Sequence, residues 1–67
     1  MYLIVNGETI EGLPEAMSVA ALLAHLTLPV TKIAVERNLE IVPKSTFKQT
    51  RLSEGDRLEI IHFIGGG

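Results

Sequence analysis

The residues that most clearly suggest a chemical role are the last three, Gly65, Gly66 and Gly67. Glycine buries no side chain and loses the most conformational entropy on ordering, so three in a row contribute nothing to a core. They do provide a thin, flexible segment that carries the carboxylate of Gly67 away from a folded domain. We therefore expect residues 65–67 to be a flexible tail, residues 1–64 to be the domain that presents it, and the Gly67 carboxylate to be the reacting group.

Other side chains that could be reactive lack the partners that catalysis or metal binding needs. The chain has no cysteine, which excludes a thiolate nucleophile, a disulfide framework and a cysteine zinc site. His25 and His62 show no metal-ligand spacing, so we expect structural or surface roles and no metal. Ser18, Ser45 and Thr46 have no histidine and aspartate arranged as a triad.

Length, composition and charge describe one small globular domain. The 67 residues suffice for a single domain, and 46% of them are hydrophobic. The net charge is −2 and the lysines and arginines are scattered singly, so we expect no nucleic-acid partner. No apolar run approaches the ~20 residues that span a bilayer, and the start lacks a basic leader. We expect a cytoplasmic protein that is a monomer when free and binds no membrane.

The first third of the chain predicts a hairpin followed by a helix. Residues 2–5 and 8–11 read as strands around Asn6-Gly7, the pair that suits a turn with positive φ at both central positions. Ser18 can cap a helix that Pro29 prevents from continuing. The apolar stripe of that helix has helical spacing and consists of Val19, Leu22, Leu23 and Leu26.

The rest of the chain predicts three more strands. Residues 32–37 form the third, Asn38-Leu39 a turn, and residues 40–42 a short strand that Pro43 places at a sheet edge. Residues 44–51 read as a loop with room for one helical turn. The cluster Glu54, Gly55 and Asp56 is typical of a turn, and residues 57–64 form the last strand.

This order of elements predicts an α+β fold. One amphipathic helix can cover one face of a small mixed sheet of four to five strands. The first and last strands are the most apolar, so we expect them at the centre, where as neighbours they would run parallel. The arrangement is a β-grasp.

Alternation along the last strand predicts a docking surface. If Leu58 and Ile60 point under the helix, then Glu59, Ile61 and Phe63 point away from it. Two large apolar side chains on a solvent face suggest contact with a partner. The alternative is a central strand that is covered on both faces. Glu36 and Glu40 are expected to be solvated.

Several motifs together resemble the ubiquitin-like sulfur carrier proteins, most closely the ThiS type of thiamine biosynthesis. The resemblance covers nearly the whole chain. The matching segments are Asn6-Gly7, the short helix, Ala34-Val35-Glu36, Ile41-Val42-Pro43-Lys44, the run from Ser53 to Ile60, and the final Gly66-Gly67. Family members often carry glycine at the position of Leu39. A branched side chain disfavours positive φ, so the sequence does not determine the geometry of that turn.

The resemblance implies a cycle in which the chain is a co-substrate and not an enzyme. An ATP-dependent activating enzyme of the ThiF type would join AMP to the Gly67 carboxylate. Sulfur derived from cysteine would then replace AMP and leave a thiocarboxylate. A thiazole synthase of the ThiG type would take that sulfur for the thiazole ring of thiamine. No cofactor would be held permanently. Gly66 and Gly67 would enter the partner's narrow active site, and Gly65 and Gly66 would contact the partner enzyme.

Elementary chemistry agrees with this cycle. An α-carboxyl group has a pKa of roughly 3.3–3.7, so at neutral pH it is an anion and a poor electrophile. Adenylation converts it into a mixed anhydride with a good leaving group. Three alternatives remain open: the small subunit of molybdopterin synthase, a ubiquitin-like protein modifier, and a β-grasp binding module without chemistry.

Overall fold

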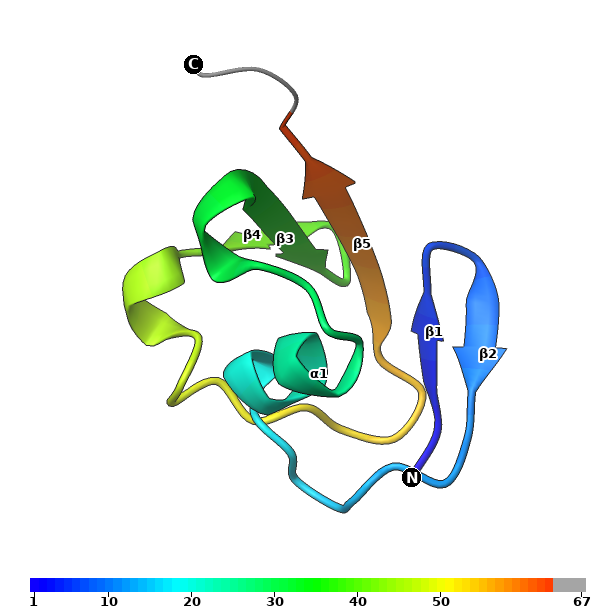
Figure 1. The fold of residues 1–67 in the computed structure, drawn as a ribbon. Helices are drawn as coiled ribbons and strands as arrows, with labels where there is room; N and C mark the ends of the chain where they lie inside the picture. The colour runs from blue at the N-terminus through cyan, green and yellow to red at the C-terminus, as the bar shows by residue number, and fades with distance from the viewer. Residues whose placement is uncertain (64–67) are drawn as a thin grey trace.

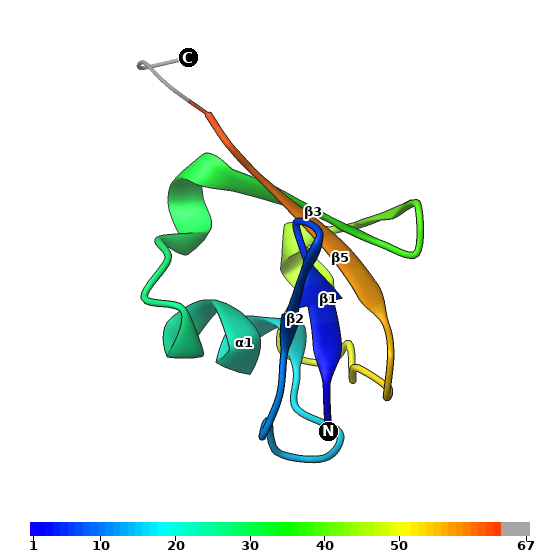
Figure 2. The same ribbon diagram turned by 90° about the vertical axis from the view of Figure 1, so that its right-hand side faces the viewer.

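One mixed sheet of five strands and one α-helix make up the part of the chain that this computed structural model describes, residues 1–63 (Figure 1). The elements are β1 (Leu3–Val5), β2 (Glu8–Ile10), α1 (Val19–His25), β3 (Ile33–Arg37), β4 (Glu40–Val42) and β5 (Arg57–His62), with 3₁₀ turns η1 (Val30–Lys32) and η2 (Lys44–Thr46). The predicted α+β class with one helix on one sheet face is confirmed, and Figure 2 shows α1 on one side of the sheet.

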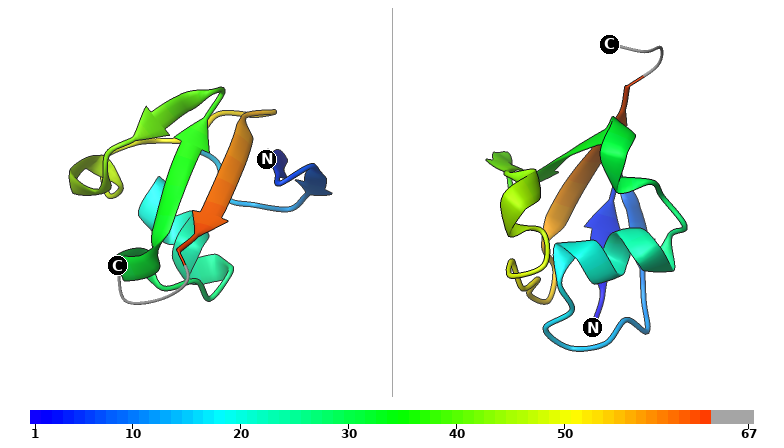
Figure 3. Two further views of the ribbon diagram at one scale, coloured as in Figure 1. Left: turned by 90° about the horizontal axis from the view of Figure 1, so that it is seen from above. Right: turned by 60° about the vertical axis from the view of Figure 1, so that its left-hand side comes forward.

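The last strand is the centre of the sheet, whose order is β2-β1-β5-β3-β4. β5 pairs in parallel with β1 and antiparallel with β3. Seen from above, β5 lies between β3 and the N-terminal hairpin (Figure 3). The prediction that the first and last strands are parallel neighbours is confirmed, and so is the edge position of β4, which Pro43 follows.

Both hairpins turn through two residues with positive φ. Asn6 and Gly7 have φ values of 49° and 83°, as the Asn-Gly pair predicts. Asn38 and Leu39 repeat the pattern with 49° and 72°. Leu39 therefore accepts a conformation that its branched side chain disfavours, and that side chain is 91% exposed, so it packs against little.

The helix begins at its predicted cap and buries the predicted stripe. The Ser18 hydroxyl oxygen accepts a 3.0 Å hydrogen bond from the backbone N–H of Ala21. Three side chains of the stripe are fully buried over the sheet, namely Val19, Leu22 and Leu23. Leu26 is half-buried and packs at the margin of this core.

The helix ends before Pro29, through a left-handed residue. Thr27 has a φ of 55°. The N–H groups of Thr27 and Leu28 donate to the carbonyls of Ala24 and Leu23, at 3.1 and 2.9 Å. This pair of bonds is a Schellman motif, which closes the helix without the proline.

Several predicted strands were too long at one end. The N–H of Tyr2 donates to the Glu54 carboxylate and not to a neighbouring strand. Glu11 lies beyond the last β1–β2 pair, and Lys32 belongs to η1. The last pair between β3 and β5 joins Ile33 to His62, so β5 ends at His62 and not at residue 64. Ile64 lies outside the described residues, so the domain boundary at residue 64 stays a prediction.

Candidate functional site

Alternation along β5 separates its side chains as predicted. Leu58 and Ile60 are only 1% and 6% exposed and belong to the core beneath α1. On the other face Glu59 is exposed, Ile61 is 46% exposed, and Phe63, which follows the strand, is 55% exposed. The predicted alternation of Leu58, Glu59, Ile60 and Ile61 is confirmed, and Phe63 beyond the strand is exposed. Contact of these residues with a partner stays a prediction.

Side chains of β3 and β4 join these residues on the sheet face opposite α1. Glu59 lies opposite Glu36, and Ile61 lies opposite Ala34. On the far side of Glu36 the paired residue is Ile41 of β4. We call this surface the outer face, and it consists of Ala34, Glu36, Ile41, Glu59, Ile61 and Phe63.

Sequence reasoning missed Ile41, although the signal was present. Val42 is 8% exposed and faces the core, so strand alternation turns Ile41 outward, where it is 66% exposed. Glu36, expected to be solvated, is half-buried between its two neighbours, and Val35 beside it is buried. The outer face is therefore wider than the last strand alone.

Two carboxylates face each other on the outer face, and neither forms an ion pair within residues 1–63. Glu36 and Glu59 are directly opposite across β3 and β5. Like charges in that position destabilise a sheet. The ion pairs found within residues 1–63 join Arg37 to Asp56 and the amino group of Met1 to Glu15. The outer face thus combines apolar contact area with an attraction for a basic side chain.

A buried carboxylate fixes the start of β5. The Asp56 carboxylate accepts from the Nε of Arg37 at 2.8 Å, the amide of Asn38 at 3.1 Å and the backbone N–H of Ser53 at 2.8 Å. Burial acts to raise the pKa of Asp56, but the hydrogen bonds from Ser53, Asn38 and Arg37 and the Arg37 charge outweigh it and hold that pKa below its ordinary value. The predicted turn residue also ties β5 to the β3–β4 hairpin.

The same turn is held against the first strand. Gly55 has a φ of 79°, and its N–H donates to the carbonyl of Tyr2 at 2.9 Å. A Cβ at Gly55 would lie 3.1 Å from the Tyr2 hydroxyl. The N–H of Ile4 donates to the carbonyl of Asp56 at 2.9 Å. These contacts set where β5 begins relative to β1.

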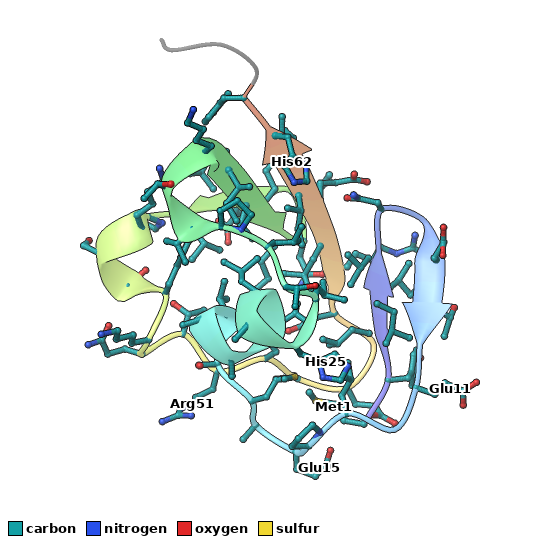
Figure 4. The ribbon with its side chains drawn as sticks, viewed as in Figure 1. Met1, Glu11, Glu15, His25, Arg51 and His62 are labelled. Carbon is teal, nitrogen blue, oxygen red and sulfur yellow. The ribbon has the colours of Figure 1, made fainter. Side chains whose placement is uncertain are left out.

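The two histidines lie on different elements and are exposed. His25 is in the last turn of α1 and His62 ends β5, and Figure 4 shows them far apart. Within residues 1–63 no three histidine, aspartate or glutamate side chains are grouped so that they could hold a metal ion. Nor does any helix in that range have the length and apolar character to cross a bilayer.

A shallow hollow lies beside β4. Its volume is about 180 Å³. Small-molecule pockets usually measure roughly 300–1,000 Å³. It is lined by Arg37, Glu40, Ile41, Val42, Pro43, Thr46 and Thr50. Its size makes it a poor candidate for a nucleotide site.

The predicted reacting group lies beyond the described part of the chain. Gly65, Gly66 and the carboxylate of Gly67 are outside the described residues, so their predicted roles stay predictions. β5 is the element that leads toward them, and the outer face lies beside its end.

Comparison with known proteins identifies a family and several similar proteins. Residues 3–67 match the model of the ThiS family. The sulfur carrier protein ThiS of Bacillus subtilis is 35% identical over 63 residues, which are 94% of this chain and 96% of that protein. A thiazole synthase of Paramagnetospirillum magneticum is 52% identical over all 67 residues, and one of Magnetococcus marinus is 41% identical over 61 residues, or 91% of this chain.

The chain spans only a small part of the two thiazole synthases, 20% and 16% of their lengths. Solved structures agree over the full length. The crystal structure of the thiamine biosynthesis protein ThiS from Geobacter metallireducens covers all of both chains with a TM-score of 0.85 and 33% identity. The solution structure of a thiamine biosynthesis protein from the same organism gives a TM-score of 0.82.

Proposed function

Because this chain belongs to the ThiS family, we propose that it is a sulfur carrier in thiamine biosynthesis, with the carboxylate of Gly67 as the carrying group. The observation that supports this most strongly is the match of residues 3–67, which includes the final glycines, to the ThiS model. Similarity over nearly the full length of the Bacillus subtilis sulfur carrier supports it further. The absence of cysteine fits a reducing cytoplasm as the place of the reaction.

The proposed chemistry has two steps, activation of the Gly67 carboxylate and then transfer of sulfur to its carbon. A Gly67 carboxylate oxygen attacks the α-phosphorus of ATP and pyrophosphate leaves, which gives an acyl adenylate. Sulfide derived from cysteine then attacks the acyl carbon, the bond from that carbon to the AMP oxygen breaks, and AMP leaves. The thiol proton is lost to solvent, which gives the thiocarboxylate without any oxidation or reduction. Cleavage of ATP drives the first step, and the activating enzyme of the ThiF type provides the catalytic groups. The chain is therefore a co-substrate that holds no cofactor of its own.

A thiazole synthase of the ThiG type is the acceptor that we propose. Two relatives named thiazole synthase contain a segment similar to nearly all of this chain, within proteins several times longer. A carrier-like segment in the same polypeptide as a synthase supports a working contact between the two. The same argument favours thiazole synthase over the large subunit of molybdopterin synthase, which we keep as the alternative acceptor.

The outer face is the docking surface that we propose for these partners. Its exposed apolar side chains Ile41, Ile61 and Phe63 can be buried by a partner, and Glu36 and Glu59 can pair with a basic side chain there. Gly66 and Gly67 would then pass into an active site too narrow for side chains.

The docking proposal predicts separate effects on binding and stability. Ile61→Asp should weaken binding to the activating enzyme at least about tenfold, because it places a charge in an apolar contact. The melting temperature should change little, since Ile61 is 46% exposed and outside the core. Thr9→Asp, an exposed change on β2, is the control. Unchanged binding by Ile61→Asp would reject the outer face as the docking surface.

The carrier proposal is tested by intact mass. The 67-residue chain is incubated with a ThiF-type enzyme, ATP and a cysteine-derived sulfur source, and its mass should rise by the difference between sulfur and oxygen. Omission of ATP and removal of Gly66 and Gly67 are the controls, and both should abolish the increase. A chain whose mass never rises is not a sulfur carrier. Pull-downs with thiazole synthase and with the large molybdopterin synthase subunit then distinguish the two acceptors, and isopeptide conjugates in extract would instead indicate a protein modifier.

A further inference from the structure

Asn6 makes more contacts with β5 than a turn residue requires. Its side-chain amide donates to the carbonyl of Ile60 at 3.3 Å, and the N–H of Ile60 donates to the amide oxygen at 2.7 Å. Its own backbone N–H donates to the carbonyl of Leu58 at 2.9 Å. Three hydrogen bonds therefore join one residue of the first hairpin to the central strand, 54 positions away for the side-chain pair.

These bonds lie where main-chain pairing between β1 and β5 stops. The parallel register pairs Ile4 with Arg57 and Val5 with Leu58, and at Asn6 the chain turns away into β2. β5 continues past this turn (Figure 1). A side-chain amide has the same N–H donor and C=O acceptor as a peptide group. The Asn6 amide thus acts as one further peptide unit beside Ile60, after the strand has left.

The hairpin alone does not require asparagine for this. A positive φ of 49° is also open to glycine and aspartate. Glycine would make neither side-chain bond to Ile60, and an ionised aspartate would keep only the acceptor. Asparagine is the residue that satisfies both the turn and the two groups of Ile60.

We propose that Asn6 is a positioning residue for the carrier reaction: its amide holds β5 at Ile60 and so fixes the direction in which the chain leaves the sheet toward Gly67. β3 holds the opposite edge of β5, through the pair Ile33 and His62 and the bond from the N–H of Phe63 to the carbonyl of Lys32. With both edges held, a partner docked on the sheet meets the outgoing chain at one fixed place. The inference rests on the proposed function, because positioning matters only if Gly67 reacts.

The chain offers a matched control at the other end of β5. Asn38 also turns a hairpin, with the same φ of 49°, and its side chain also makes two bonds, donating to Asp56 and accepting from the N–H of Arg57. Asn38→Gly removes as many side-chain bonds as Asn6→Gly but leaves the end of β5 that faces the tail untouched.

The test is the rate of pyrophosphate release by the activating enzyme with ATP, as a function of carrier concentration. Asn6→Gly should lower kcat about tenfold or more while KM stays within about twofold, because docking survives and alignment of the reacting carboxylate does not. Asn38→Gly should leave kcat unchanged. Asn6→Asp, which keeps the acceptor, should fall between Asn6→Gly and the wild type. Melting curves establish that every variant is folded at the assay temperature.

Hydrogen exchange reports on the contact itself. The amide of Ile60 should exchange faster in Asn6→Gly than in the wild type or in Asn38→Gly. Equal kcat for the wild type and Asn6→Gly, or an equal loss in Asn6→Gly and Asn38→Gly, would overturn the positioning role. If the wild-type chain itself releases no pyrophosphate, the proposed function fails and the inference fails with it, a result distinct from a wild type that reacts and an Asn6→Gly that reacts equally well.

Discussion

Replacing Asp56 with asparagine is the change that tests most directly how the start of β5 is held. The carboxylate accepts bonds at 2.8, 3.1 and 2.8 Å from Arg37, Asn38 and Ser53, and it is only 8% exposed. Asparagine keeps one acceptor oxygen, but its NH₂ group would face one of the three donors. Asp56→Asn therefore removes the charge and turns at least one bond into a contact between two donors.

The expected loss is a large part of the stability of this domain. A hydrogen bond to a charged group contributes about 1.5–3 kcal/mol, and with part of the network retained we expect a loss of about 2–3 kcal/mol. A domain of 67 residues should have an unfolding free energy of roughly 3–10 kcal/mol. Each kcal/mol corresponds to about 4–8 °C in a domain of this size, so the melting temperature should fall by about 8–24 °C.

The stability difference between wild type and Asp56→Asn should also depend on pH, in a direction that the pKa of Asp56 determines. The pKa of Asp56 is lowered by folding, so its ionised form stabilises the native state. That contribution is complete above its unfolded pKa of about 3.9 and is lost as the pH falls through the lower folded pKa. The difference between wild type and Asp56→Asn should therefore be largest at neutral pH and should shrink below about pH 4.

Urea unfolding at pH 7 and at several acid pH values measures both effects. Glu8→Gln is the control, because the Glu8 carboxylate is exposed and makes no hydrogen bond within residues 1–63, and it should change neither the stability nor its pH dependence. A pH 7 difference below about 0.5 kcal/mol, which is the range of ordinary surface changes, would refute the role of the network. So would a difference that stays constant down to the acid end of the series.

Three further changes should shift stability in known directions, each measured by urea unfolding. Glu59→Lys replaces the like-charge pair with Glu36 by an attraction and should stabilise the domain by about 0.5 kcal/mol at low salt. The same change should impair sulfur transfer. Equal stabilisation in low and high salt would contradict the charge argument. Gly55→Ala should lower the free energy of unfolding by about 1–2 kcal/mol, because alanine disfavours the φ of 79° and its Cβ would lie 3.1 Å from the Tyr2 hydroxyl. An unchanged stability would show that the turn adapts. Leu39→Gly should stabilise the domain by up to about 1 kcal/mol, because glycine accepts the φ of 72° and the leucine side chain is 91% exposed. A loss of stability would mean that the leucine side chain makes stabilising contacts despite its exposure.

Local chemistry made much of the fold predictable. The Asn6-Gly7 pair determines its own turn, because positive φ is a property of those two residues and their neighbours. The cap at Ser18 and the apolar stripe act within single turns of the helix. Alternation along β5 assigned each side chain to a face, because successive residues of any strand point in opposite directions. The exact ends of strands were less predictable, since they depend on where a neighbouring strand stops.

The sequence by itself determined the elements, their order, the faces of the last strand and the glycines that carry the proposed chemistry, because each of these depends on residues close together in the chain. Only the tertiary structure decided that Glu36 lies opposite Glu59 on one side and opposite Ile41 on the other. It alone joined Asn6 to Ile60, across 54 positions. Such contacts depend on the register between strands that come from distant parts of the chain, and that register is set by the packing of the whole sheet against its helix.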